Sequence, residues 1–344
     1  MNKGQEQNNK PGHRNKALDF VKGWLVVGMV AYHIASFSNH TGRGDYQLIT
    51  STLSFISGSW IYISGAIIAT YYATKSIHSW TAVAKRLAVR GIKLLVIFLG
   101  MNIILIELGW SNLGAGYSFN TLYTVLVPGT GNASFEILIG ISYVLLISPV
   151  LLFNMWMGIF LALAIIFSEL FIYYQGRDVA LNHWIMACGA GGFLVGRLIA
   201  SDWHKKSHLH NRKFITPLLV ATVSVALYFY LKPLWLPGTR NMPIYLFGIT
   251  SILAMTYLCY PLFSGFAIFT SYIDILGRYS LVSYIWQMCI IASLSALRVH
   301  IDLGSSYIVE FTIVMAILLA SIHLLSTVLM RSVLARKYYG WLFG

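Results

Sequence analysis

Long apolar runs recur along the whole chain and are separated by more polar segments. Each run has about 20 residues, the length of helix needed to cross the hydrocarbon core of a bilayer. Such segments must be helical, because lipid offers no partner to unpaired backbone groups. The pattern therefore predicts an all-α polytopic membrane protein, a bundle of about ten transmembrane helices at residues 18–38, 50–73, 87–109, 133–153, 155–174, 184–203, 214–232, 243–264, 280–298 and 307–331.

Composition agrees with this pattern. Apolar residues make up 57% of the chain and charged residues only 10%, whereas a soluble domain carries about a quarter charged residues. The three cysteines (Cys188, Cys259 and Cys289) lie inside apolar runs, so we expect them to be packing residues rather than disulfide partners. No cleavable signal sequence is expected. We predict a polar cytoplasmic tail at 1–17, a single membrane domain at 18–331 and a second cytoplasmic tail at 332–344.

The formal net charge of +13 is compatible with nucleic-acid binding, but cytoplasmic loops of membrane proteins produce the same excess of Lys and Arg. With the amino terminus in the cytoplasm, nineteen of the 24 Lys and Arg residues fall on that side. The five on the other side are Arg43, Arg177, Lys232, Arg240 and Arg298. This asymmetry predicts cytoplasmic termini and an even number of spans, with membrane lipids and not nucleic acid as partners.

The first apolar run, "LDFVKGWLVVGMVAYHI", contains Asp19, Lys22 and His33. Lys22 and His33 are eleven residues apart, so on a helix they point within about 20° of each other and lie about 16 Å apart along the axis. Ionisable groups in a span usually face the bundle interior or a water-filled path. The pair indicates a polar path along the first helix. The alternative is that Lys22 extends to the cytoplasmic headgroups and His33 lies at the opposite interface.

His33 has the chemistry of a general base, because an imidazole exchanges protons near neutral pH. Such a base needs an orienting acid, and the half of the bundle away from the cytoplasm offers several. Glu107 and Glu136 are the preferred candidates. The other acids in this half are Glu169, Glu310 and Asp45, and any of the five acids is equally compatible with simple solvation at the interface.

A second group of charges lies on the cytoplasmic side. In "AKRLAVRGIKLL", Arg86, Arg90 and Lys93 are spaced four and three residues apart and share one helical face. Such a face suits phosphate groups, which Arg contacts with two hydrogen bonds; the alternative is anchoring to headgroups. Arg278 is added to this predicted phosphate-binding set. The sequence has no P-loop, HExxH or Cys/His metal motif, and we read the loop "DWHKKSHLHNRK" as solvated and basic rather than metal-binding.

A lysine, ten intervening residues and a histidine in the first span resemble the signature of transmembrane acyltransferase family 3 and its relatives, the periplasmic-glucan succinyltransferases and heparan glucosaminide N-acetyltransferases. "ALDFVKGWLVVGMVAYH" is similar to the family's opening Leu-Asp-x-x-Arg/Lys-Gly run ending in His. "ISGSWIYISGAIIA" resembles its second span, with Ser64 and Gly65 at the matching place, and "RLAVRGIKLL" resembles the start of its third. "LGRYSLVSYIWQM" resembles its late motif, at Leu276, Gly277, Ser280, Leu281 and Tyr284.

Two positions depart from the family pattern. Lys22 replaces the more usual Arg, and Gln287 stands where a His often follows the late motif. No second catalytic histidine is therefore carried over.

The resemblance implies an integral enzyme of the bacterial inner (plasma) membrane that moves an acyl group, acetyl or succinyl, from cytoplasmic acyl-CoA to a hydroxyl of a glycan or glycolipid beyond the membrane. His33 would be the base, oriented by Glu107 or Glu136, and Lys22 would line the acyl-CoA path. CoA phosphates would be held by the predicted set Arg86, Arg90, Lys93 and Arg278. No metal is implied. Direct transfer and an acyl-histidine intermediate both remain open.

Two other classes of function are compatible with the residues. A secondary transporter or flippase would use Lys22 and His33 as coupling sites and would show broken helices. The stretch "CGAGGFLVGR" (188–197) is either such a break or a close-packed helix. A non-catalytic sensor or scaffold is the third class, and only the enzyme predicts binding of CoA thioesters. The uncharged loop at about 110–132 is either re-entrant or interfacial.

Overall fold

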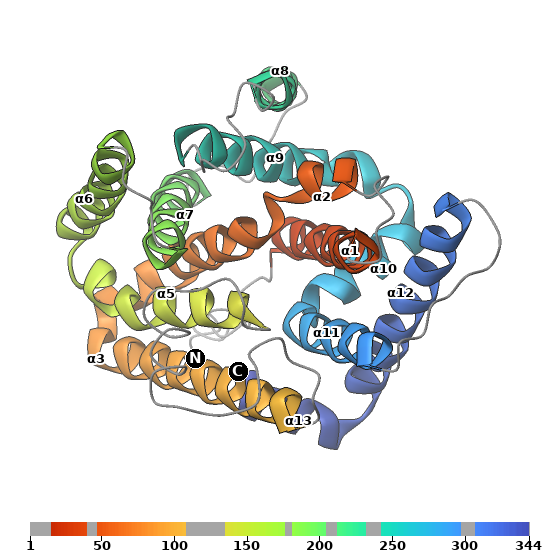
Figure 1. The fold of residues 1–344 in the computed structure, drawn as a ribbon. Helices are drawn as coiled ribbons and strands as arrows, with labels where there is room; N and C mark the ends of the chain where they lie inside the picture. The colour runs from red at the N-terminus through yellow and green to blue at the C-terminus, as the bar shows by residue number, and fades with distance from the viewer. Residues whose placement is uncertain are drawn as a thin grey trace, which may run out of the picture.

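The computed structural model describes residues 15–39, 47–107, 135–175, 181–203, 212–231, 242–296 and 307–343, and within them every regular element is an α-helix. The helices, shown in Figure 1, are α1 (Lys16–Asn39), α2 (Gln47–Leu53), α3 (Ile56–Glu107), α5 (Glu136–Phe153), α6 (Met155–Tyr174), α7 (Leu181–Trp203), α8 (Arg212–Leu231), α9 (Met242–Phe263), α10 (Ala267–Arg278), α11 (Ser280–Ala296), α12 (Tyr307–Arg331) and α13 (Val333–Phe343).

Each of the ten predicted segments coincides with helical structure. Among the described residues, six stretches are long and apolar enough to cross a membrane: Lys16–Ser36, Leu48–Tyr72, Ser79–Ile104, Met155–Ile172, Pro243–Phe263 and Phe311–Arg331. Four shorter apolar helices accompany them: Ile137–Phe153, Trp184–Leu198, Leu218–Tyr230 and Ser280–Ile291. The described part of the chain is all-helical, and its apolar helices are those of a multi-pass membrane protein.

The third helix is longer than the sequence pattern predicts. α3 contains 52 residues and joins the two segments predicted at 50–73 and 87–109. Its backbone leaves helical geometry at Ser79, where φ is −160° and ψ is 75°, so the helix is kinked there. The residues between the two apolar segments are helical rather than a loop. The kink sets the relative direction of the two arms of α3.

A second interruption separates α2 from α3 inside an apolar segment. Tyr245 of α9 binds the backbone there: the Gly58 N–H donates to the Tyr245 hydroxyl (3.3 Å), and that hydroxyl donates to the Ser54 carbonyl (3.1 Å). Such partners allow a helix to be interrupted at membrane depth.

The very short turn predicted around Asn154 is confirmed, because this one residue joins α5 to α6. Its Oδ1 accepts hydrogen bonds from the N–H groups of Trp156 (2.9 Å) and Met157 (3.3 Å). Asn154 therefore caps the first turn of α6.

Two helices were not among the predicted spans. α10 is a 12-residue amphipathic helix that buries Thr270, Ile273, Leu276 and Gly277. α13 occupies residues 333–343 of the predicted carboxy-terminal tail and packs against α12 and α3. Both are too short, and too interrupted by polar residues, to resemble a span.

α1 lies inside the bundle and packs against α2, α3, α9, α10, α11 and α12 (Figure 1). Its backbone nearly touches that of α10. A Cβ atom at Gly277 would lie 1.8 Å from the Asp19 carbonyl oxygen, and one at Gly23 would lie 2.1 Å from the Ile273 carbonyl oxygen. Small residues permit such approaches between membrane helices. The glycines of "FVKG" and "LGR" therefore hold α1 and α10 together.

α3 and α7 also approach each other closely at glycine residues. A Cβ atom at Gly192 would lie 1.8 Å from the Tyr62 carbonyl oxygen, and one at Gly196 would lie 2.4 Å from that of Ala66. The stretch 188–197 is part of continuous helix α7. Its glycines serve close packing rather than a helix break.

The outer helices present apolar side chains to their surroundings. α6, α8 and α12 lie at the edges of the bundle (Figure 1). Large exposed apolar side chains lie on all three, including Trp156, Phe160, Phe167, Leu219, Val223, Ile317 and Leu324. An apolar surface of this extent is suited to lipid.

Candidate functional site

A cavity of about 240 Å³ lies between α1, α3, α5 and α11. Its wall is mostly apolar, with isoleucine and leucine side chains from α3 and α5 and the Trp60 ring. The polar and charged side chains that line it are Lys22, Ser64, Tyr72, Arg90, Ser280 and Tyr284. An apolar concavity with a few convergent polar groups is the usual form of a small-molecule site.

Lys22 is half-buried and lines this cavity from α1. Its Nζ atom forms an ion pair with Oδ1 of Asp19 at 2.7 Å, and Asp19 is itself buried. The spacing of three residues puts both side chains on one face of the helix. Lys22 therefore has a charged partner beside the cavity, which favours the polar-path interpretation over extension to headgroups.

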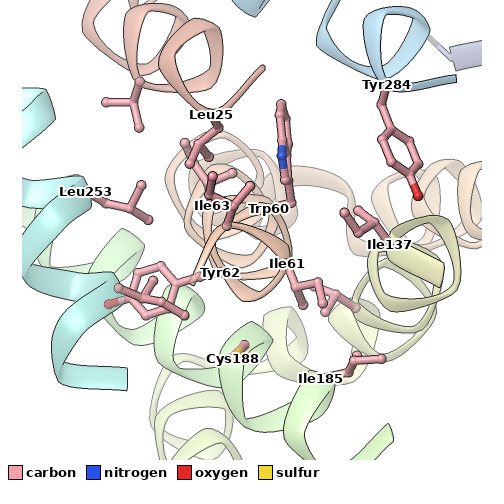
Figure 2. Packing of buried hydrophobic residues seen from close by; sticks show 14 of the residues in the cluster. Leu25, Trp60, Ile61, Tyr62, Ile63, Ile137, Ile185, Cys188, Leu253 and Tyr284 are labelled. Atoms are coloured by element: carbon pink, nitrogen blue, oxygen red, sulfur yellow. The ribbon is translucent and has the colours of Figure 1, made fainter. Parts of the chain in front are cut away.

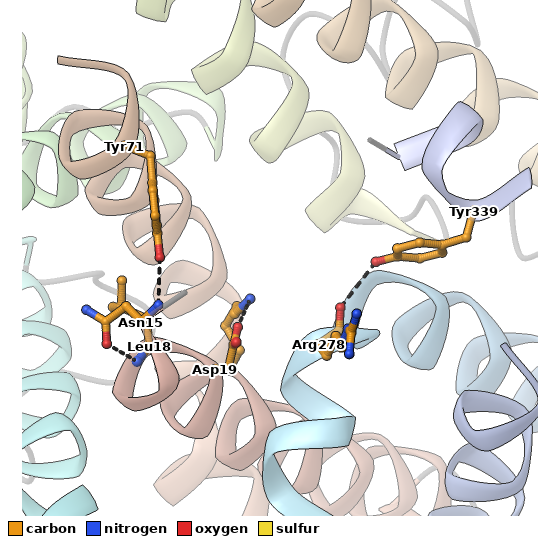
Figure 3. A network of polar contacts seen from close by, with 7 residues as sticks. Asn15, Leu18, Asp19, Tyr71, Arg278 and Tyr339 are labelled. Atoms are coloured by element: carbon orange, nitrogen blue, oxygen red, sulfur yellow. Dashed lines mark hydrogen bonds and ion pairs between the residues drawn. The ribbon is translucent and has the colours of Figure 1, made fainter. Parts of the chain in front are cut away.

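The start of α1 is tied to two neighbouring helices, α3 and α9; Figure 3 shows the contact with α3. Oδ1 of Asn15 accepts a hydrogen bond from the Leu18 N–H (3.2 Å), and the Asn15 N–H donates to the Tyr71 hydroxyl of α3 (3.0 Å). The Asn15 side-chain amide also reaches the Tyr257 hydroxyl of α9 (3.5 Å). These bonds fix the turn that carries Asp19 and Lys22.

Arg90 lines the cavity from the second arm of α3 and donates from Nη1 to the Tyr72 hydroxyl of the first arm. In a straight helix these two residues, eighteen positions apart, would be separated by about 27 Å along the axis. Their contact therefore requires the kink at Ser79. The fold of α3 brings a cation into the space lined by Lys22.

The other members of the predicted phosphate-binding set have different surroundings. Arg86 is exposed. Lys93 donates to the Trp341 carbonyl of α13, and its Nζ lies 5.0 Å from the centre of the Trp341 ring. Arg278 is exposed at the end of α10, and its carbonyl accepts a hydrogen bond from the Tyr339 hydroxyl of α13 at 3.3 Å (Figure 3). Arg90 lines the cavity, whereas Lys93 and Arg278 contact α13.

His33 does not itself line the cavity but lies next to a residue that does. The centres of the His33 and Tyr284 rings are 6.4 Å apart. In Figure 2 the Tyr284 side chain extends from α11 toward Ile137 of α5, with Trp60 nearby. Tyr284, Ile137 and Trp60 all line the cavity. Tyr284 therefore connects the cavity to His33.

The other side of Tyr284 is held by a residue with an unusual backbone. The Phe135 ring packs edge-on against Tyr284, with ring centres 6.0 Å apart. Phe135 is buried, and its φ of 65° is in the left-handed region. Left-handed geometry at such a residue costs about 1–3 kcal/mol and persists only where its surroundings impose it. The strained residue immediately precedes α5.

None of the described carboxylates contacts His33. Glu107 is exposed at the end of α3, and Glu169 is buried on α6, which packs against α5, α7 and α9. Asp45 and the side chains of Glu136 and Glu310 lie outside the described part of the chain. The backbone of Glu136 begins α5, directly after Phe135.

Reasoning from the residues alone did not identify several residues that line the cavity, nor Asp19, the ion-pair partner of Lys22. Asp19 had a readable signal, its spacing of three from Lys22. Ser64, Ser280 and Tyr284 entered only through the family resemblance. Tyr72 had no local signal, because its role depends on the kink in α3.

Comparisons with known proteins give no match for this chain among protein-family models, curated proteins or solved structures.

Proposed function

We propose that the chain is an acyl-CoA-dependent O-acyltransferase of the membrane, which moves an acetyl or succinyl group to a hydroxyl of a glycan or glycolipid. The observation that carries this proposal is the convergence of Lys22, Arg90, Ser64, Ser280 and Tyr284 on one cavity. They come from the four separate stretches that resemble acyltransferase family 3. Helix packing alone does not require these four stretches to share a cavity.

The cavity has the chemistry that part of an acyl-CoA needs. Arg90 and Lys22 offer cationic hydrogen-bond donors to phosphate oxygens, and the apolar wall suits a pantetheine arm and a short acyl chain. A volume of about 240 Å³ is small for a whole CoA molecule. We therefore assign the cavity to the acyl-phosphopantetheine end, with the nucleotide near Lys93, Arg278 and α13.

His33 supplies the base in this proposal, about 16 Å beyond Lys22 along α1. It takes the proton of the acceptor hydroxyl while the hydroxyl oxygen attacks the thioester carbonyl carbon. The C–S bond then breaks, and CoA leaves as a thiolate, which takes up the proton that His33 held. Glu136 is favoured over Glu107 as the orienting acid, because it follows Phe135, whose ring contacts Tyr284.

The proposal includes a topology. The six long and four shorter apolar helices would supply ten spans with both termini in the cytoplasm, in a bacterial inner membrane. Acyl-CoA would then enter at the Lys22 end of α1, and the acceptor would meet His33 from the other side.

Ligand binding to the purified protein tests the proposal. Thermal shift and titration calorimetry with acetyl-CoA, succinyl-CoA and free CoA should show binding, and the preferred thioester identifies the acyl group. A transporter that uses Lys22 and His33 as coupling residues predicts no binding of any of the three. A folded protein that binds neither thioester would refute the proposed function.

A further inference from the structure

Gln287 of α11 is a fully buried amide. Neither its Nε2 nor its Oε1 atom has a hydrogen-bond partner among the described residues. Leaving a buried polar group unpaired costs about 1–3 kcal/mol. An amide with both ends unpaired therefore calls for an explanation other than packing, and a polar ligand is one.

Gln287 lies on the face of α11 that contributes to the cavity wall. Ser280, Tyr284 and Gln287 are spaced four and three residues apart, so they lie on one face of α11. The first two line the cavity. Gly277, three residues before Ser280, lies against Asp19 near the start of α1, whereas Tyr284 contacts His33 near the end of that helix, so α1 and α11 run in the same direction past the cavity. Gln287 lies one turn beyond Tyr284, toward the His33 end.

His33, like Gln287, has a buried polar atom, Nδ1, without a hydrogen-bond partner among the described residues. Tyr284 contacts the His33 ring and lies one helical turn before Gln287 on α11, and the strained Phe135 packs against it. His33, Phe135 and Gln287 therefore all neighbour Tyr284, in space or by one helical turn, and Tyr284 is part of the cavity wall. Unpartnered buried polar groups and left-handed backbone residues cluster at ligand sites.

We propose that the Gln287 amide binds the carbonyl oxygen of the acyl thioester and stabilises the negative charge that forms on it. This inference rests on the proposed function. When the acceptor oxygen adds to the carbonyl carbon, the C=O electron pair moves to the carbonyl oxygen, and the Nε2 hydrogens donate to it. The pair returns as the C–S bond breaks. His33 holds the hydroxyl proton throughout this step. A donor aimed at such an oxyanion contributes about 10²–10³-fold to the rate.

The test compares Gln287→Leu with the wild type and with Met288→Leu. Met288 is the next residue of α11, and its replacement by Leu conserves volume. Transfer of radiolabelled acetyl or succinyl groups from acyl-CoA is measured in membrane vesicles that supply their own acceptors, and CoA binding is measured on purified protein. For Gln287→Leu we expect transfer at saturating thioester to fall about 100-fold or more, with free-CoA affinity unchanged. Met288→Leu should match the wild type in both.

The outcomes separate a catalytic amide from a structural one. Unchanged transfer by Gln287→Leu would overturn the inference, as would a parallel loss of melting temperature, CoA affinity and transfer. Gln287→Asn decides if the Leu variant does not fold, because it keeps a buried amide but draws it back by one methylene; wild-type transfer by this variant overturns the inference. If the wild type neither binds CoA nor transfers acyl groups, the proposed function fails, and this inference fails with it.

Discussion

Arg86 and Arg90 are one helical turn apart on α3 but have different surroundings. Arg90 is half-buried, lines the cavity and donates to Tyr72, whereas Arg86 is exposed. Spacing alone groups them on one face, and only the tertiary structure separates them. The two residues therefore form a matched pair for testing phosphate binding.

Arg90→Ala should weaken acetyl-CoA or succinyl-CoA binding without unfolding the protein. A charge-assisted hydrogen bond contributes about 1.5–3 kcal/mol, which corresponds to a loss of roughly ten- to a hundredfold in affinity. Titration calorimetry on the purified variant measures this. Arg86→Ala is the control and should bind as the wild type does. Equal effects of the two substitutions on thioester affinity would mean that the helical face shared by Arg86, Arg90 and Lys93 serves only as a topological anchor.

Lys22→Ala should lower both thioester affinity and stability, because it removes the cation that forms an ion pair with the buried Asp19 carboxylate. Lys22→Arg keeps the charge and should retain substantial function. The double variant Asp19→Asn with Lys22→Ala removes the carboxylate charge as well, so it should regain melting temperature without regaining affinity. Recovery of both would show that Lys22 matters only as the partner of Asp19.

The sequence predicted part of this site. The alignment of Lys22 with His33 follows from helical spacing, and both lie at or beside the cavity region. The contact between Tyr72 and Arg90 could not be predicted, because it depends on the backbone at Ser79. The acid that orients His33 was left open by the sequence, and the described carboxylates make no contact with His33.

Helix pairs in this protein are held by glycines at backbone contacts. Gly277→Ala would place a Cβ atom 1.8 Å from the Asp19 carbonyl oxygen. Since neither backbone can yield easily, we expect a loss of about 1–3 kcal/mol or more and reduced thioester binding through displacement of Lys22. The matched control is Gly100→Ala in α3, where nothing lies within 4 Å of the new atom. Equal melting temperatures of the two variants would contradict the close α1–α10 contact.

The elements were predicted well where they are long and apolar and poorly where they are short. The ten predicted segments coincide with helices, because a run of about 20 apolar residues has few alternatives in a membrane. α10 has an Asp and an Arg within twelve residues, and α13 has a Lys and an Arg within eleven, so neither resembles a span. Continuity through the kink of α3 is also invisible in hydropathy, which reports polarity and not backbone direction.

At the scale of the whole molecule, the distribution of Lys and Arg along the sequence predicts the orientation of the chain in the membrane. Epitope tags at either terminus should be protected from protease added outside intact cells, and a cleavage site inserted in 110–132 should be cut. The physical reason is the positive-inside bias, because the predicted topology puts nineteen of the 24 Lys and Arg residues on the cytoplasmic side. Cleavage of one terminal tag and protection of the other would mean an odd number of spans.

The central claim is that His33 acts as a base beside an acyl-CoA cavity, and two histidines of the membrane helices allow a direct test. His323 of α12 is also buried at Nδ1 without a partner among the described residues, but it stacks on Tyr272, with ring centres 4.8 Å apart. His323→Ala should transfer acyl groups as the wild type does. His33→Ala should transfer about a hundredfold less or worse, the usual contribution of a positioned base, while its binding of the CoA thioester is unchanged.

The decisive measurement is acyl transfer from radiolabelled acyl-CoA, recorded beside thioester binding for the wild type, His33→Ala and His323→Ala. The account predicts three proteins that bind the thioester equally and one, His33→Ala, that transfers the acyl group about a hundredfold less or worse. Wild-type transfer by His33→Ala would contradict the account, because transfer would then not depend on His33 as the base.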